Sequence, residues 1–452
     1  MRSDTVNARE SVSFGRILAL AWPVAIASAS APLLGLVDAW AIGRSDTPLA
    51  VGAVALGGVI FATLYWAFGF LRMSAAGGVA QAVGRGDEEG ARVVLAHGVA
   101  IGLVVGTGLA LLQAPIGAAA FFALASGAAT SDATFEAARS YYAIRIWAAP
   151  AALGAFAILG WLSGRGLTGA VMAVSVGMNV LNVILDYWFV LGLGMGAAGV
   201  ALGTAIAEVF GLVLSAGFAL WALRKSGGVK AAWSRARLFD KAALKSAFVL
   251  NRDIFIRTLI LVTIFSWFTK HSAAYGDVVL SANQILLQLV LMTGLALDGV
   301  AIAAEALVGR AIGDKSYPAY RDTVRKSAVL AAAAAALFSL AYLVFGGPIA
   351  GMMTTSEAVR AAVEAHFLWA ALSPVALAAC FFLDGVFIGA MRGRELRNAM
   401  LQSGALYVAT WFVLAPSFGN HGHWAAFGLF FLFRAFTLWA VLPRIGAAIK
   451  AP

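Results

Sequence analysis

The chain has 452 residues, of which 62% are hydrophobic and 12% are charged, and its formal net charge is +10. Soluble domains carry about 25% charged residues, so this composition excludes an ordinary soluble globule and predicts an integral membrane protein. The basic residues lie in short loops between apolar runs and form no separate polar domain, which argues against nucleic-acid binding.

Twelve apolar runs are long enough to cross about 30 Å of hydrocarbon, for which a helix needs roughly 20 residues. We therefore predict an all-α integral membrane protein with twelve transmembrane helices. The predicted spans are residues 15–42, 52–83, 93–122, 138–161, 168–191, 196–223, 246–269, 279–309, 324–346, 361–391, 398–417 and 424–446.

The distribution of lysine and arginine predicts the orientation. With the N-terminus inside, 23 of these residues fall in cytoplasmic segments, and four fall in outer loops, namely Arg44, Arg139, Lys270 and Arg360. Cytoplasmic loops carry the excess of Lys and Arg in membrane proteins, so both termini are predicted to be cytoplasmic.

The longest polar stretch, residues 224–245, follows the sixth span and divides the chain. It predicts an N-lobe at 1–223, a cytoplasmic basic linker at 224–245 and a C-lobe at 246–452. The basic residues and Trp233 of the linker fit an amphipathic segment on the anionic inner leaflet, and they fit a plain solvated connection equally well.

The two halves resemble each other. Aligning the Gly-Arg pair at 84–85 with that at 309–310 gives an offset of 225 residues, and aligning 164–165 with 393–394 gives 229. Two landmarks at nearly one offset predict a duplicated six-helix unit. Because six is even, both copies run the same way through the membrane, so we expect two pseudo-symmetric lobes with a cavity between them.

Within the first span, the apolar stretch from Ile17 to Ile42 contains a single charge, Asp38, together with Pro23 and Pro32. An acid at that depth costs roughly 3 kcal/mol or more to insert, so its default interpretation is functional. The prolines cannot donate backbone hydrogen bonds, and the helix is expected to bend. A lone acid on a bendable helix indicates a proton or cation switch.

The fifth span carries Asn179, Asn182 and Asp186 at spacings of three and four, so they share one helix face. Polar groups stacked on one face of a membrane helix point into protein or water. The glycine-rich turn that follows is expected to bring Thr204 to the same pocket, and Tyr141 offers it a hydroxyl. A purely structural polar clasp between helices is the alternative.

The second half contains its own acids in predicted spans. Asp298 and Glu305 are seven residues apart and lie nearly on one face, and Asp384 lies in the tenth span. These are secondary site candidates. The alternative is a buried salt bridge with Arg257 or Arg434 that holds helices in register.

Nothing in the sequence indicates catalysis. It contains no Walker-type phosphate loop, so direct ATP hydrolysis is not expected, and we expect no enzyme. His421 and His423 fall in a predicted outer loop, where we expect them to be exposed and not to hold a metal.

Taken in order, these segments resemble the multidrug and toxic compound extrusion (MATE) transporters, specifically their DinF-like branch. The motifs that carry the resemblance are LVDAWAIGRSDTPLAVGAVALG, VAQAVGRGDEEGARVV, NVLNVILDYWFVLGLGMGAAGVALGTAIAE, NRDIFIRTLILV and LALDGVAIAAEALVGRAIG. The likeness covers essentially the whole chain. It implies a MATE-like pair of six-helix lobes, and the coupling residues that it implies are Asp38, Tyr141, Asn182, Asp186 and Thr204, with the bend at Pro23.

The function implied is proton-coupled antiport that exports amphipathic, often cationic compounds, with protonation of Asp38 driving the bend of the first helix. Sodium coupling, with Na⁺ at Asp38, Asn182, Asp186 and Thr204, is one alternative, and a lipid-linked precursor flippase of the same superfamily is another. The seventh span has no acid at its middle, so we expect no sodium site there. We expect a functional monomer in the bacterial inner membrane, with the lipid bilayer and small drugs as partners and without a cofactor.

Overall fold

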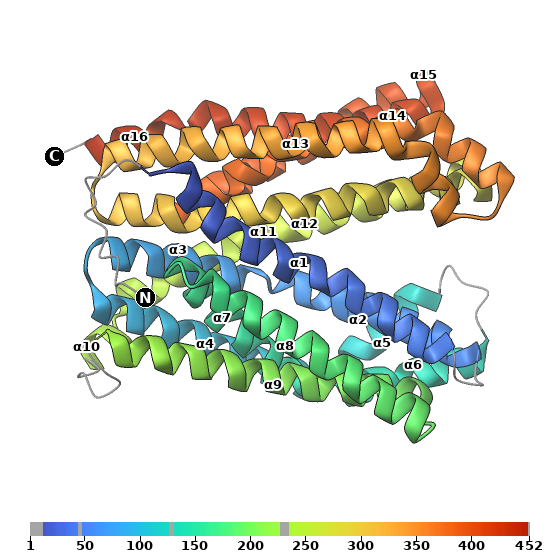
Figure 1. Cartoon of the computed structure of the whole chain (residues 1–452), viewed down its shortest axis with the longest axis horizontal. Helices are drawn as coiled ribbons and strands as arrows, with labels where there is room; N and C mark the ends of the chain where they lie inside the picture. Colours follow the sequence, from blue (N-terminus) through green and yellow to red (C-terminus); the bar gives the residue numbers. More distant parts are fainter. Residues whose placement is uncertain (1–11, 44–47, 126–130, 227–234, 451–452) are drawn as a thin grey trace. The chain divides into compact units, whose positions relative to one another are not determined.

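The computed structural model describes residues 12–43, 48–125, 131–226 and 235–450, without the side chains of residues 31–43, 48–49, 125, 235–236 and 243 (Figure 1). These residues form a helical protein that divides into two compact units. Unit 1 comprises Met1–Ala25, Ala80–Gly86 and Lys245–Pro452, and unit 2 comprises Ile26–Val79 and Asp87–Leu244. The predicted boundary at 224–245 stays a prediction.

The first half of the chain forms helices separated by short breaks. They are α1 (Phe14–Gly43), α2 (Pro48–Ala67), α3 (Phe70–Gly84), α4 (Glu88–Leu111), α5 (Gln113–Ala125), α6 (Asp132–Arg145), the 3₁₀ turn η1 (Ile146–Ala148), α7 (Ala149–Gly164), α8 (Thr168–Asp186), the π-helical turn η2 (Tyr187–Gly192), α9 (Gly196–Lys225) and α10 (Arg235–Leu238). The two longest of them, α1 and α9, have 30 residues each.

The helices of the second half are longer, and α12 to α15 run alongside one another in Figure 1. They are α11 (Lys241–Ser272), the 3₁₀ turn η3 (Ala273–Tyr275), α12 (Asp277–Gly313), α13 (Tyr317–Met353), α14 (Glu357–Gly389), α15 (Gly393–Val441) and α16 (Pro443–Lys450).

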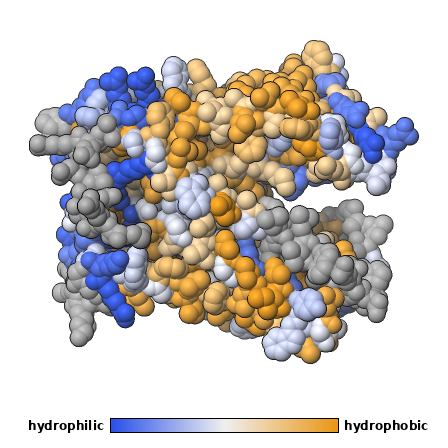
Figure 2. All heavy atoms as spheres, viewed as in Figure 1, coloured by the Kyte–Doolittle hydropathy of each residue, from blue (hydrophilic) through white to orange (hydrophobic). Residues whose placement is uncertain are grey.

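The length and hydropathy of the helices confirm a multi-pass membrane protein. In the described part of the chain, nine helical stretches are long and apolar enough to cross a membrane. Large apolar side chains such as Val104, Val213 and Phe412 are exposed, as expected of groups that face lipid. On the face shown in Figure 2, hydrophobic residues cover the middle of α12 to α15 and hydrophilic ones gather where α13 begins. The exact number of twelve spans stays a prediction.

The expected loop before the last span is a tight turn. The residues of predicted spans eleven and twelve form the two helical arms of α15, which meet where the helical backbone is interrupted at Gly419 (φ +56°, ψ −135°). Glycine reaches this left-handed region without the steric cost of a Cβ atom. An added Cβ on Gly422 would overlap the carbonyl of Leu414, so the two arms touch closely at this turn.

Glycines at helix crossings reveal the internal repeat. An added Cβ on any of four glycines would overlap the backbone of the facing helix, so these helices pack backbone against backbone. The crossings are Gly160 on Arg72 and Gly164 on Ala76 in unit 2, and Gly385 on Ala301 and Gly389 on Glu305 in unit 1.

These crossings correct the sequence alignment of the two halves. The offset is 225 residues between α7 and α14 (385 − 160) and 229 between α3 and α12 (301 − 72). Gly84 therefore corresponds to Gly313, not to Gly309, and Gly164 corresponds to Gly389, not to Gly393. Each predicted pairing was wrong by four residues. The true counterparts, Gly313 and Gly389, are not followed by arginine, and the aligned Gly-Arg pairs lie one helical turn away from them.

The described end of the basic linker docks on α4. Arg237 Nη1 lies 2.8 Å from Asp87 Oδ1, and the imidazole Nε2 of His97 lies 2.8 Å from the carbonyl oxygen of Leu238. The hydrogen bond to Asp87 raises the pKa of Arg237. This end of the linker is therefore held by specific contacts and is more than a solvated connection.

Helix α1 takes part in both units. Its start lies on α12, where a Cβ added to Gly299 would come within 2.7 Å of the carbonyl oxygen of Ala21. Farther along, Ser30 Oγ accepts a hydrogen bond of 2.7 Å from Asn179 of α8. Pro23 is buried and lies between these contacts, two residues before the boundary between the units.

Candidate functional site

Three of the predicted site residues meet in unit 2 between α8 and α9. Asn182 Nδ2 donates a hydrogen bond to Asp186 Oδ1 (3.2 Å) and lies 3.5 Å from Thr204 Oγ1. The side chains of Asn182 and Asp186 are 0% exposed, and that of Thr204 is 7% exposed. We call Asn182, Asp186 and Thr204 the amide–carboxyl cluster.

Local sequence explains this geometry. Asn182 and Asp186 are one helical turn apart on α8, and helix geometry places such residues on one face. On α9, Gly203 faces them without a side chain, and a Cβ there would lie 2.5 Å from Asp186 Oδ1. The small residue is what lets the polar side chains fit between the two helices.

Tyr141 belongs to a second cluster. Its hydroxyl accepts a hydrogen bond of 2.8 Å from Arg145 Nη1. Arg145 also donates to Glu208 Oε1 from Nε (3.2 Å) and Nη2 (2.8 Å), and Tyr65 donates to Glu208 Oε2 (3.1 Å). The guanidinium lies 4.6 Å from the centre of the Phe61 ring. We call Tyr65, Tyr141, Arg145 and Glu208 the ion-pair cluster.

The two clusters lie one turn apart on α9, because Thr204 and Glu208 are separated by four residues. Sequence reasoning did not predict Tyr65, Arg145 or Glu208 as part of the site. The available signal was the spacing of Tyr141 and Arg145, which is also four residues on one helix. A charged arginine that deep in a span requires a partner, and the partner is an acid of α9.

The remaining predictions for this half have different outcomes. Asn179 does not join the amide–carboxyl cluster, because its amide donates to Ser30 of α1. Asp38 lies on the helical backbone of α1, and its side chain lies outside the described residues. Its predicted position beside Asp186 therefore stays a prediction.

In unit 1, Asp384 forms a buried ion triad. Both Arg257 and Arg434 donate to the same carboxylate oxygen, Asp384 Oδ2. The predicted alternative, a buried salt bridge with one of these arginines, is realised with both. Asp298 is half-buried on α12, and Glu305 is buried where Gly389 packs against its backbone.

A second polar network of unit 1 corrects the expectation of an exposed histidine pair for one of the two: His421 is exposed, but His423 is buried. His423 is 0% exposed, and its Nδ1 accepts a hydrogen bond of 2.8 Å from Trp411. The indole N–H is a donor only, so this bond fixes the proton of a neutral His423 on Nε2. Asn283 and Asn420 exchange two hydrogen bonds beside it, of 2.8 and 3.0 Å.

Comparison with known proteins identifies the family. The family model described as MatE matches residues 23–188 and 254–400. DNA damage-inducible protein F of Escherichia coli is 34% identical over 94% of this chain and 91% of its own length. Protein DETOXIFICATION 44 of Arabidopsis thaliana is 27% identical over 95% of this chain and 82% of its own. A probable multidrug resistance protein NorM of Neisseria meningitidis is 26% identical over 78% and 76%, respectively.

Solved structures share the fold. A MOP superfamily transporter from Pyrococcus furiosus matches with a TM-score of 0.85 at 19% identity, over 98% of both chains. The MATE transporter VcmN of Vibrio cholerae in its bent form matches with a TM-score of 0.84 at 18% identity, over 97% of this chain and 98% of that one. With the family model matching most of its length, the chain belongs to the MatE family of multidrug and toxic compound extrusion transporters, in its DinF-like branch.

Proposed function

We propose that the protein is a proton-coupled antiporter that exports amphipathic, often cationic compounds by alternating access, and that it works as a monomer. The observation that carries this proposal is the carboxyl group of Asp186, fully buried in a membrane-spanning helix beside the amide of Asn182. Membership of the MatE family and relatives named as multidrug resistance proteins support efflux as the activity.

Protonation of Asp186 would rearrange the contact between α8 and α9. An ionised carboxylate only accepts hydrogen bonds, whereas a protonated one also donates. Thr204 uses its hydroxyl hydrogen on the carbonyl of Val200 (2.9 Å) and therefore presents lone pairs to the cluster. Asn182 Oδ1 accepts no hydrogen bond from any residue that the structure describes. Both oxygens are acceptors for the new proton, so its arrival changes which groups bond across the two helices.

Glu208 is less suited to this role. Arg145 donates twice to one of its oxygens, and Tyr65 donates to the other. Removing the charge of Glu208 would leave a buried guanidinium without its counter-ion, which costs several kcal/mol, about 3–5. We therefore assign the ion-pair cluster to positioning: it fixes α2, α6 and α9 around the amide–carboxyl cluster.

We further propose that Asp38 takes part in the same proton exchange and that α1 bends at Pro23. Supporting this, the part of α1 before Pro23 packs on α12 and the part after it is bonded to α8. A proline in a helix interior removes one backbone hydrogen bond, so bending there breaks no further bond. A bend at Pro23 would move the end of α1 that carries Asp38 relative to its start.

Sodium coupling is the second candidate, and the donor set favours it too. The carboxylate of Asp186, Oδ1 of Asn182 and the hydroxyl of Thr204 are hard oxygen ligands of the kind that small cations prefer. They would hold Na⁺ at the place where a proton would otherwise bind.

The test is export of a fluorescent organic cation from proteoliposomes with separately imposed proton and sodium gradients. We expect a proton gradient to drive export without sodium, and Asp38→Asn to abolish it while the protein still elutes as a folded monomer. Full proton-driven export by Asp38→Asn would contradict the assigned role of Asp38. If a sodium gradient drives export at constant pH and a proton gradient alone does not, sodium is the coupling ion.

A second prediction tests the amide–carboxyl cluster with a substitution that changes no charge. Gly203→Ala adds a methyl group 2.5 Å from Asp186 Oδ1, so α9 must move away and the cluster opens. We expect proton-driven export to fall at least tenfold. Gly217→Ala is the matched control, because it makes the same change on α9 where no atom lies within 4 Å. Equal export by the two variants would contradict the role of the cluster.

A further inference from the structure

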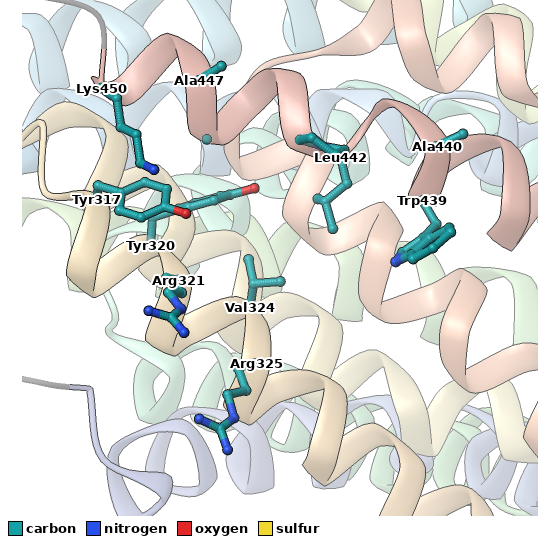
Figure 3. A pocket seen from close by; sticks show the side chains of 12 residues that line it. Tyr317, Tyr320, Arg321, Val324, Arg325, Trp439, Ala440, Leu442, Ala447 and Lys450 are labelled. Carbon is teal, nitrogen blue, oxygen red and sulfur yellow. The ribbon is translucent and has the colours of Figure 1, made fainter.

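Unit 1 contains a pocket that the proposed transport mechanism does not use. It lies between the start of α13 and the junction of α15 with α16, and its volume is about 650 Å³ (Figure 3). Its walls combine basic, aromatic and aliphatic side chains, and none of its lining residues is acidic. The lining residues on which the argument rests are Tyr317, Tyr320, Arg321, Arg325, Trp439 and Lys450.

The charge of the pocket is uncompensated within the described part of the chain. Arg321 and Arg325 are four residues apart on α13, are both exposed, and extend to the same side of the helix in Figure 3. Like charges at this spacing repel each other on a helix. Neither arginine forms an ion pair with any described residue, and the nearby acid Asp322 is paired with Lys326 (3.4 Å). A bound anion would relieve this repulsion.

The third cation is held over the pocket by an aromatic ring. Lys450 Nζ lies 4.0 Å from the centre of the Tyr317 ring, and Figure 3 shows the ammonium group pointing toward that ring. Gly446 makes this possible, because a Cβ there would come within 3.1 Å of Tyr317. The ammonium group keeps donor hydrogens available, since the ring face engages it as a cation and not as a hydrogen-bond donor to an oxygen.

The rest of the pocket is apolar. Trp439 is 64% exposed, and Leu442 and Val324 complete a hydrophobic wall beside the cations. The pocket also lies at the polar end of two membrane-crossing stretches, Tyr317–Met353 and Gly393–Lys450. Tyrosine and tryptophan at such ends mark the headgroup level of a bilayer. A ligand here therefore meets cations and hydrocarbon side by side.

We propose that this pocket binds an anionic phospholipid, with the phosphate held by Arg321, Arg325 and Lys450 and the acyl chains lying against Trp439 and Leu442. A planar guanidinium pairs well with phosphate oxygens, and two of them with an ammonium form a three-sided phosphate site. The lipid would connect the beginning of α13 to α16 and hold the C-terminal helix in place. A free phosphate compound would use the cations alone and leave the apolar wall without a role.

The experiment is native mass spectrometry of the detergent-purified full chain titrated with phosphatidylglycerol, with phosphatidylcholine as the zwitterionic comparison. We expect at least tenfold tighter binding of phosphatidylglycerol. The double variant Arg321→Gln/Arg325→Gln should weaken the binding of phosphatidylglycerol at least tenfold, because each removed charge is expected to weaken it about fivefold. Arg444→Gln is the matched control, since it removes an exposed charge of α16 outside the pocket lining and should change binding less than twofold.

Two further arms separate the sources of the phosphate group. Ala447→Trp fills the pocket without changing charge and should also weaken phosphatidylglycerol binding at least fivefold. Inorganic phosphate or glycerol phosphate in millimolar excess should not displace the lipid. If either compound displaces the lipid, the proposal of a lipid ligand is wrong and the pocket binds a soluble phosphate compound. Equal losses in the pocket variants and in Arg444→Gln, or no loss in any of them, would overturn the site itself.

Discussion

At the scale of single residues, the Asp384 triad places two positive charges on one carboxylate inside a membrane protein. The side chains of Arg257, Asp384 and Arg434 are 7%, 9% and 1% exposed. The two guanidiniums repel each other, and each is attracted to the same oxygen, Asp384 Oδ2. We assign Asp384 to joining α11, α14 and α15, because both buried arginines depend on its charge.

This assignment predicts a large loss of stability in Asp384→Asn. The neutral amide leaves two buried guanidiniums facing each other, and breaking a buried ion pair in this way costs about 3–5 kcal/mol. The measurement is the thermal unfolding midpoint in detergent. Asp322→Asn is the control, because it breaks a half-exposed pair with Lys326 and should cost about 0.5 kcal/mol at most. If both variants unfold at the temperature of the wild type, the triad contributes nothing to stability.

The residues show where sequence reasoning succeeds and where it ends. The common face of Asn182 and Asp186 followed from helix periodicity, which is local, and the structure brings Thr204 to them across a short turn. The same periodicity offers Arg145 as a partner of Tyr141, but it does not predict the acid that binds Arg145, which is Glu208 of α9. A pair 63 residues apart depends on which helices are neighbours, and that is set by packing of the whole unit.

At the scale of helices, the crossing of α3 with α7 and the crossing of α12 with α14 have the same close packing. Each crossing places two glycines, four residues apart, against a facing backbone. In lipid, helices gain little from burying apolar surface against each other, so small residues that allow close approach supply the packing energy. The same close crossing therefore occurs once in each unit.

A prediction for the crossing of α12 and α14 follows. Gly385→Ala would force an added methyl group into the carbonyl of Ala301, and overpacking of this kind costs about 1–3 kcal/mol. We expect the same loss for Gly160→Ala at the equivalent crossing in unit 2. Gly428→Ala of α15 should leave the unfolding midpoint within one degree of the wild type, because nothing lies within 4 Å of its added Cβ. If all three variants have the same unfolding midpoint, the crossings are not close-packed in the membrane.

Helix ends were harder to predict from sequence than helix existence. The single spans expected at 52–83 and 93–122 are each two helices, with breaks after Ala67 and Leu111. Hydropathy does not detect these breaks because the residues on both sides are apolar. The expected loop before the last span is a tight turn at Gly419 between the two arms of α15, but the predicted exposure of its polar residues was wrong for His423, which is buried.

At the scale of the whole molecule, the membrane class follows from composition alone, while the division of labour between the two units does not. Each unit contains a buried acid with arginine partners, Glu208 with Arg145 and Asp384 with Arg257 and Arg434. Among the residues that the structure describes, only unit 2 adds an amide–carboxyl pair, Asn182 with Asp186, on the neighbouring helix α8. Two copies of one scaffold therefore carry different polar contents, which supports a coupling role for unit 2.

Orientation in the membrane is a property of the whole chain, and α12 offers a direct test of it. This helix has 37 residues and is about 55 Å long at 1.5 Å per residue, so its two ends lie on opposite sides of a bilayer. Ala274 and Asp314 are exposed at these ends. With both termini cytoplasmic, Ala274 faces outward and Asp314 faces inward.

We therefore expect a membrane-impermeant maleimide to label Ala274→Cys in intact spheroplasts and Asp314→Cys only after the membrane is permeabilised. The wild type is the control for background, since its Cys380 is buried and should not react. The opposite labelling pattern would place the termini outside. It would also move the basic pocket of α13 and α16 to the outer leaflet, because Tyr317 follows Asp314 by three residues, and the excess of Lys and Arg in the expected inner loops would then be left without an explanation.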